Sequence, residues 1–168
     1  TPARWRGRGA LPPLSHGIGV KRHLMTQMSS DQAIARLAKR PPVGASKLLG
    51  SEPVEIDTER GFARIAYAAK PEFCNYLGLV HGGFLSAMMD EAMAIAAAAQ
   101  RNFEYVVPTL AMKTTYLAPA KPGRLLAEGL VVRAGRRVAF LEAKLFNEDG
   151  ILAATASATA HIRKAPWL

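Results

Sequence analysis

Two carboxylates stand in the middle of an otherwise apolar segment of this chain. Asp90 and Glu91 interrupt the run from Phe84 to Ala99, which consists mainly of Ala, Met and Leu. A buried carboxylate is costly unless it is paired, hydrogen-bonded or protonated, so its presence needs a reason. The reason is either acid–base or nucleophilic chemistry, or a position at a helix edge where the group reaches solvent or an ion pair. The segment alone leaves both open.

The tripeptide His81-Gly82-Gly83 directly precedes this segment. The first backbone N–H groups of a helix have no intrahelical acceptor, and the positive end of the helix dipole lies beside them. Such a place can bind a carbonyl oxygen or a developing oxyanion. Glycines there let a ligand approach the backbone, but a tight turn uses the same residues for conformational reasons alone.

The spacing between these two features constrains how they can act together. Gly82 and Asp90 are eight residues apart, which on a helix is ~12 Å. One substrate carbonyl cannot easily meet both. If both act on it, Asp90 must come from a neighbouring copy of the chain, with the two helices side by side across a two-fold axis. The spacing therefore predicts an obligate homodimer with two composite sites.

The elements that must position these residues follow from hydrophobic patterning. The segment 82–100 is rich in strong helix formers and apolar nearly all round, which predicts a buried helix. Strand-like runs cover 54–68, which Gly61 divides into two strands or a hairpin, and then 105–117, 124–133, 137–146 and 151–162. Short turns join the last four runs, which indicates an antiparallel meander.

The last of these runs has a face of small side chains. Alternate positions from Leu152 to Ile162 are mostly alanine, so a helix could lie very close to the sheet. We expect the alanine-rich helix to lie there. The resulting fold class is α+β, with a long helix packed against an antiparallel sheet.

A short helix is expected before this core. Serines 29 and 30 supply capping hydroxyls for a helix over 31–39, and prolines 41 and 42 end it. We assign residues 29–168 to a single domain. Residues 1–28 form an N-terminal extension, vector-derived or disordered, with a methionine at 25 or 28 as a natural start.

The net charge of +9 raises nucleic acid or an anionic surface as a partner. Five of the cations lie in residues 1–30, which contain no acid, so the remainder carries only +4. We therefore expect no nucleic-acid partner. The apolar run is also shorter than the ~20 residues of a membrane span, and we expect no membrane contact. A single cysteine, Cys74, suits a reducing compartment and a cytoplasmic location.

Residues 75–83, with the sequence Asn-Tyr-Leu-Gly-Leu-Val-His-Gly-Gly, are followed by Asp90. This pattern resembles the signature of hotdog-fold acyl-CoA thioesterases of the phenylacetate-degradation and 4-hydroxybenzoyl-CoA type. The resemblance extends over about residues 48–162, including the strand end 114–120 and the hairpin 135–140. It implies a hotdog fold, in which an antiparallel sheet wraps a long central helix. It also implies hydrolysis of an aryl- or medium-chain acyl-CoA by a homodimer that pairs further into a homotetramer.

The resemblance also implies roles for individual residues. The backbone N–H of Gly82 and the side chain of Asn75 would polarise the thioester carbonyl. Asp90 of the partner would activate water or attack directly. Thr109 would help to hold the water, and His81 would contact the thioester or organise the turn. A thioester is already activated, so this chemistry needs neither a metal nor an organic cofactor, and the scattered histidines form no metal motif.

Coenzyme A is polyanionic, so basic residues are candidates for its phosphates. The candidate CoA-binding residues are Gly83, Arg136, Arg137, Arg163 and Lys164. Surface arginines and lysines more often only solvate a protein.

Two other functions stay open. The fold could serve as a non-catalytic acyl-CoA-binding or regulatory module, because fold alone does not fix function. Hotdog hydratases and dehydratases also act on acyl thioesters, with a histidine as base, and His81 is a candidate for that role. The carboxylate nine residues after His81 follows the thioesterase pattern instead.

Overall fold

The computed structural model describes residues 28–39 and 44–165. The helices are α1 (Ser30–Ala38), α2 (Ala45–Leu49) and α3 (Gly82–Ala99), with a 3-10 turn η1 (Pro71–Phe73). The strands are β1 (Glu52–Asp57), β2 (Phe62–Ala69), β3 (Tyr105–Val106), β4 (Thr109–Tyr116), β5 (Gly123–Ala134), β6 (Val138–Phe146), β7 (Leu152–His161) and β8 (Arg163–Lys164). The prediction for residues 1–28 falls almost wholly outside the described residues, as do the prolines expected to end α1.

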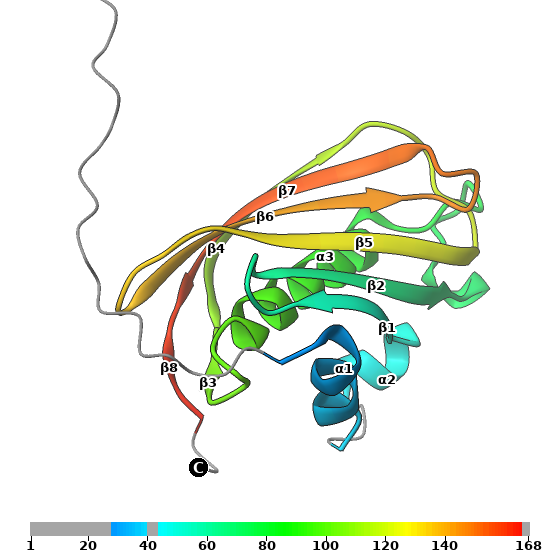
Figure 1. Cartoon of the computed structure of the whole chain (residues 1–168). Helices are drawn as coiled ribbons and strands as arrows, with labels where there is room; N and C mark the ends of the chain where they lie inside the picture. Colours follow the sequence, from blue (N-terminus) through cyan, green and yellow to red (C-terminus); the bar gives the residue numbers. More distant parts are fainter. Residues whose placement is uncertain (1–27, 40–43, 166–168) are drawn as a thin grey trace, which may run out of the picture.

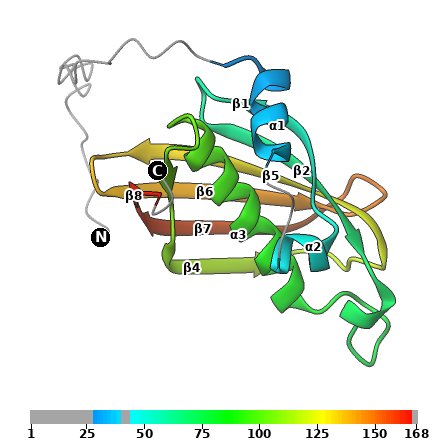
Figure 2. The ribbon, with the colours of Figure 1, turned by 90° about the horizontal axis from the view of Figure 1, so that it is seen from below.

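Six strands form one antiparallel sheet in the order β1-β2-β5-β6-β7-β4, and β3 pairs with β8 separately. The long helix α3 lies across one face of this sheet, which curves over it (Figures 1 and 2). The predicted α+β class, with a sheet wrapped round a long helix, is confirmed. The hairpin of β1 and β2 and the helix α3 also lie where the sequence predicts them.

The order of the strands departs from the predicted meander. β5, β6 and β7 follow one another, but β4 lies beyond β7, and β5 pairs on its other side with β2. The run 105–117 is also not one strand, because β3 and β4 are separated at Val107 and Pro108 and belong to different sheets. Proline cannot donate to a strand ladder, which explains the break. The helix α2 was not predicted.

The helix makes its closest approach to β5 and not to β7. A Cβ at Gly129 of β5 would collide with the backbone of Ala92 and Met93, so only glycine allows the helix to lie so near the sheet. The alanines of β7 are buried and α3 lies against the sheet, as expected (Figure 2), but the nearest approach is at β5. Gly129, which the sequence pattern did not single out, therefore lies where the helix is nearest to the sheet.

The two edges of the large sheet differ. At the β1 edge, α1 is capped by Ser29, and the Ser30 hydroxyl accepts a hydrogen bond from the Ile56 N–H at 3.0 Å. At the other edge, β4 pairs with β7 on one side, and no described strand pairs with its other side (Figure 2). Leu110 of β4 is 64% exposed. One edge is thus covered by a helix of the same chain, and the other is open.

No helix in the described part of the chain is both long and apolar enough to cross a membrane.

Candidate functional site

The backbone N–H groups at the start of α3 are almost all occupied. The N–H of His81 donates to the Phe73 carbonyl at 2.9 Å, that of Gly83 to Nδ1 of His81 at 3.1 Å, and that of Phe84 to the His81 carbonyl at 2.9 Å. Within residues 28–39 and 44–165, the Gly82 N–H has no acceptor. It is therefore the free donor at the positive end of the helix dipole.

The His81 side chain organises this turn. Its Nδ1 accepts a hydrogen bond, so that nitrogen carries no proton, and the neutral ring holds its proton on Nε2. The bond caps α3 and uses the N–H of Gly83, one of the candidate CoA-binding residues. The exposed His81 ring keeps Nε2 for another partner.

Asn75 lies in the loop that leads to α3. Its side-chain oxygen accepts hydrogen bonds from the N–H groups of Leu77 at 2.9 Å and Leu79 at 3.3 Å. The carboxamide oxygen is thus held by the loop, and its NH2 group has no acceptor among the described residues. A β-bridge between Cys74 and Val80 closes the loop beside the start of α3. The structure therefore brings a second free donor to the same end of this helix.

Asp90 and Thr109 are brought together by α3 and β4. The Thr109 hydroxyl donates to Oδ1 of Asp90 at 2.6 Å, a short distance typical of a hydroxyl bound to a carboxylate. Oδ2 of Asp90 has no hydrogen-bond donor in the described part of the chain. One oxygen is held and the other is free, which is an arrangement suited to taking up a proton.

The predicted catalytic residues thus form two groups within one chain. Asn75, His81 and Gly82 lie at the start of α3, and Asp90 and Thr109 lie at its middle. The helix separates the two groups by ~12 Å. A single chain does not place them around one substrate carbonyl.

Glu91 has different surroundings from Asp90. Its Oε2 is buried and has no hydrogen-bond partner among the described residues. It lies near Tyr67 of β2, whose hydroxyl donates to the Met88 carbonyl at 2.8 Å. Burial raises the pKa of Tyr67, and the nearby Glu91 carboxylate raises it further. Glu91 therefore faces β2, whereas Asp90 faces β4.

The basic candidates lie at the other end of α3. Arg136, Arg137, Arg163 and Lys164 are all exposed. The Ile162 N–H donates to the Arg137 carbonyl at 2.8 Å, which places the β5–β6 turn beside β8. Arg101, just after α3, donates to the Gly135 carbonyl at 2.7 Å and joins this group. Sequence reasoning missed Arg101 because nothing in its neighbours predicts that contact.

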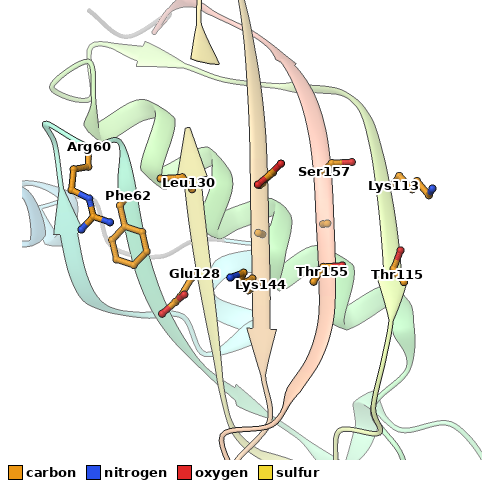
Figure 3. Close-up of a pocket in the computed structure, with 12 residues that line it drawn as sticks. Arg60, Phe62, Lys113, Thr115, Glu128, Leu130, Lys144, Thr155 and Ser157 are labelled. Carbon is orange, nitrogen blue, oxygen red and sulfur yellow. The ribbon is translucent and has the colours of Figure 1, made fainter. Parts of the chain in front are cut away.

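A hollow of about 520 Å³ lies on the face of the sheet opposite to α3 (Figure 3). Its lining includes Arg60, Phe62, Lys113, Glu128 and Lys144. None of the predicted catalytic residues lines it, so this hollow is separate from the two groups described above. Nor does the described part of the chain contain a group of three His, Cys, Asp or Glu side chains that could hold a metal ion.

The family model described as "Thioesterase superfamily" matches residues 77–154. The medium/long-chain acyl-CoA thioesterase YigI of Salmonella typhimurium is 25% identical over 116 residues, which span 60% of this chain and 75% of that protein.

Two solved structures match a larger share of this chain than YigI does. The phenylacetic acid degradation-related protein of Ralstonia eutropha is 33% identical, with a TM-score of 0.70 over 77% of this chain and 98% of that one. The PaaI protein from the phenylacetic acid degradation operon of E. coli is 22% identical, with a TM-score of 0.71 over 82% of this chain and 98% of that one. At that identity the likeness is one of fold.

Proposed function

The chain belongs to the thioesterase superfamily and is a thioester hydrolase, and on this premise we propose that it cleaves an acyl-CoA to the free acid and CoA. The names of its relatives support CoA as the thiol, since YigI is a medium/long-chain acyl-CoA thioesterase. The Ralstonia and E. coli proteins are related to phenylacetic acid degradation. We therefore propose an aryl- or medium-chain acyl group.

The observation that carries the proposal is the unoccupied N–H of Gly82 at the start of α3. A thioester carbonyl placed there would accept hydrogen bonds from this N–H and from the Asn75 amide. Negative charge develops on that oxygen as the carbonyl carbon becomes tetrahedral. Fixed donors and the helix dipole stabilise this charge more than they stabilise the ground state. This difference in stabilisation is what lowers the barrier.

Asp90 is the proposed base. Thr109 holds Oδ1, and Oδ2 is available to take a proton from a water molecule. The resulting hydroxide attacks the carbonyl carbon, the carbon–sulfur bond breaks, and the CoA thiolate leaves with the proton returned from Asp90. Direct attack by Asp90, which forms a mixed anhydride that water then cleaves, uses the same residues.

The distance between Gly82 and Asp90 supports a dimer. Two positions eight residues apart can face each other reciprocally only if two copies of α3 run antiparallel, with Ser86 at the midpoint near the two-fold axis. The open β4 edge supports contact on this side, because α1 covers the opposite edge of the sheet. In that arrangement the partner's basic residues at the end of α3 lie beyond Gly82, where the CoA phosphates would extend.

Pairing of dimers into a tetramer is proposed as well. Leu130, Val132 and Phe140 are exposed on the outer face of the sheet, and they support a contact there. We propose the cytoplasm as the location, in line with the free thiol of Cys74.

Mixed dimers test the composite site. Asp90→Asn and Asn75→Ala chains carrying different tags are co-expressed, and the heterodimer is isolated and assayed for thiol release on a panel of aryl- and fatty acyl-CoAs. Each mutant homodimer has two damaged sites and is expected to be nearly inactive. The heterodimer has one intact site and one doubly damaged site, so it should recover about half of the parent activity. A heterodimer as inactive as the homodimers would exclude shared sites.

The same panel separates the alternative functions. Tight acyl-CoA binding by the parent chain without thiol release would favour a binding or regulatory module. Hydration of an enoyl-CoA that depends on His81 would favour the hydratase class.

A further inference from the structure

A tyrosine of β4 packs against the first turn of α3. The Tyr116 hydroxyl donates to the Gly82 carbonyl at 2.8 Å and lies 2.8 Å from the Ser86 hydroxyl. Ser86 in turn donates to the Thr114 hydroxyl at 3.1 Å. A Cβ at Gly82 would lie 2.7 Å from Cζ of the Tyr116 ring. The Tyr116 hydroxyl and ring thus contact the residue that offers the free N–H, and the Ser86 and Thr114 hydroxyls continue the hydrogen-bond chain from Tyr116.

We propose that Tyr116 is a positioning residue that fixes the direction of the Gly82 N–H, an inference that rests on the proposed oxyanion role of that group. Gly82 and Gly83 are consecutive, and glycine has more backbone freedom than any other residue. A first turn of two glycines is therefore poorly suited by itself to hold a donor still. The Gly82 N–H belongs to the His81–Gly82 peptide, whose carbonyl accepts a hydrogen bond from the Phe84 N–H at 2.9 Å. The Tyr116 hydroxyl holds the carbonyl of the next peptide, and its ring lies against the Gly82 α-carbon. With the peptides on both sides held, the two backbone dihedrals of Gly82 are restricted, which provides the preorganisation that oxyanion stabilisation requires.

The geometry separates positioning from simple packing. The Tyr116 hydroxyl makes two polar contacts, with the Gly82 carbonyl and with the Ser86 hydroxyl. Phenylalanine would keep the ring contact with Gly82, and only the hydroxyl makes the polar contacts. The ring also occupies the space beside Gly82, so a side chain at position 82 would have to displace it.

The strand β4 consequently serves both groups of residues. Thr109 at its beginning holds Asp90, and Tyr116 at its end holds Gly82. In the proposed dimer, Gly82 and Asp90 of one chain belong to different sites. Each β4 strand would therefore orient the base of one site and the oxyanion donor of the other.

The test compares Tyr116→Phe with Thr115→Val in the full chain. Tyr116→Phe is expected to lower kcat on an acyl-CoA about tenfold, as expected for one lost hydrogen bond, with KM within about twofold. Thr115 lies next to it but faces the hollow on the outer side of the sheet, so Thr115→Val should leave kcat and KM unchanged. Both variants should keep the parent's fold and oligomeric state. A Tyr116→Phe kcat within twofold of the parent would overturn the proposal.

A readout independent of turnover is the amide resonance of Gly82 in protein labelled with ¹⁵N-glycine. We expect this resonance to shift in Tyr116→Phe and to stay in place in Thr115→Val. A loss of kcat with an unmoved Gly82 resonance would overturn positioning, because the hydroxyl would then act on the substrate itself. If Tyr116→Phe does not fold, Ser86→Ala replaces it, because this variant removes the Ser86 contact of the Tyr116 hydroxyl. The Gly82 resonance should then shift by less than a loss of the Tyr116 hydroxyl itself would produce, and an unmoved resonance would count against the proposal.

The two proposals fail in different ways. An Asp90→Asn variant as active as the parent would remove the proposed function. The Gly82 resonance would still report whether Tyr116 controls that N–H.

Discussion

Asp90 and Glu91 are neighbours in sequence with opposite surroundings. Asp90 faces β4 at the open edge of the sheet, where the Thr109 hydroxyl holds one of its oxygens at 2.6 Å. Glu91 faces β2, and its buried Oε2 has no partner within the described residues. Successive residues of an α-helix point about 100° apart. One step along the helix therefore separates a carboxylate directed toward the open edge of the sheet from one whose Oε2 is buried in its own chain.

The difference shows what a carboxylate needs in order to act on a substrate. Asp90 has one oxygen fixed and one available, on the side where a second copy of the chain is proposed to bind. Glu91 is directed toward Tyr67, inside the fold of its own chain. The proposed chemistry assigns a role to the first carboxylate and none to the second.

The largest expected effect is the loss of turnover when the Asp90 carboxylate, but not the Glu91 carboxylate, is replaced by an amide. Asp90→Asn removes the base and should lower kcat about 1,000-fold, within the range for general acid–base catalysis. Glu91→Gln should leave kcat within about threefold of the parent. Thiol release by the purified variants, after their folding and oligomeric state are matched, measures both. Equal losses in the two variants would show that the helix faces do not separate their roles.

The next effect concerns the hydrogen bond that holds Asp90. Thr109→Val keeps the shape of the side chain and loses the hydroxyl, and a hydrogen bond to a charged group contributes about 1.5–3 kcal/mol. We expect kcat to fall roughly 10- to 100-fold. Thr109→Ser retains the hydroxyl and is the matched control, with kcat near that of the parent. A Thr109→Val enzyme as fast as the control would mean that this contact does not matter for Asp90.

The sequence indicated that both carboxylates lie on a buried helix, but not that they face different strands. The apolar pattern of 82–100 identifies a buried helix, but a helix that is apolar all round does not indicate which side faces which strand. The strand order decides this, and the predicted meander placed β4 wrongly. Asn75, Gly82 and Asp90 were proposed because residues 75–83 and Asp90 together resemble a family signature. Tyr116 had no assigned role because its contact with Gly82 joins residues 34 positions apart.

A smaller effect is expected on the stability of the fold. Glu91→Met has a side chain of similar length without the unpaired oxygen, and replacing a buried polar group that lacks a partner by an apolar one can be stabilising. The free energy of unfolding, measured by urea denaturation at neutral pH, should rise by about 1 kcal/mol. Asp90→Met is the comparison, and it should not be stabilising because it breaks the bond to Thr109. A destabilised Glu91→Met would show that Glu91 has a stabilising partner.

The smallest effect at neutral pH is that of Tyr67 ionisation on the free energy of unfolding, which becomes measurable only at alkaline pH. Burial raises the pKa of Tyr67 in the folded state, and the Glu91 carboxylate raises it further. In the unfolded state the pKa of tyrosine is about 10. The folded state therefore keeps a proton that the unfolded state loses above this pH. The stability that this difference provides is complete below pH ~10 and is lost as the pH rises further, by up to about 1.4 kcal/mol per pH unit.

Tyr67→Phe isolates this contribution. The variant loses the hydrogen bond to the Met88 carbonyl at every pH, so its unfolding free energy should lie below that of the parent by a constant amount up to pH ~10. Above that pH the parent loses stability faster than the variant, and the two curves should converge. Denaturation series between pH 8 and 11 measure the gap, and a gap that stays constant throughout would show that Tyr67 ionises equally in both states. Glu91→Gln, introduced into both proteins, should change the convergence of the two curves only slightly. Burial, and not Glu91, is the larger cause of the raised pKa of Tyr67.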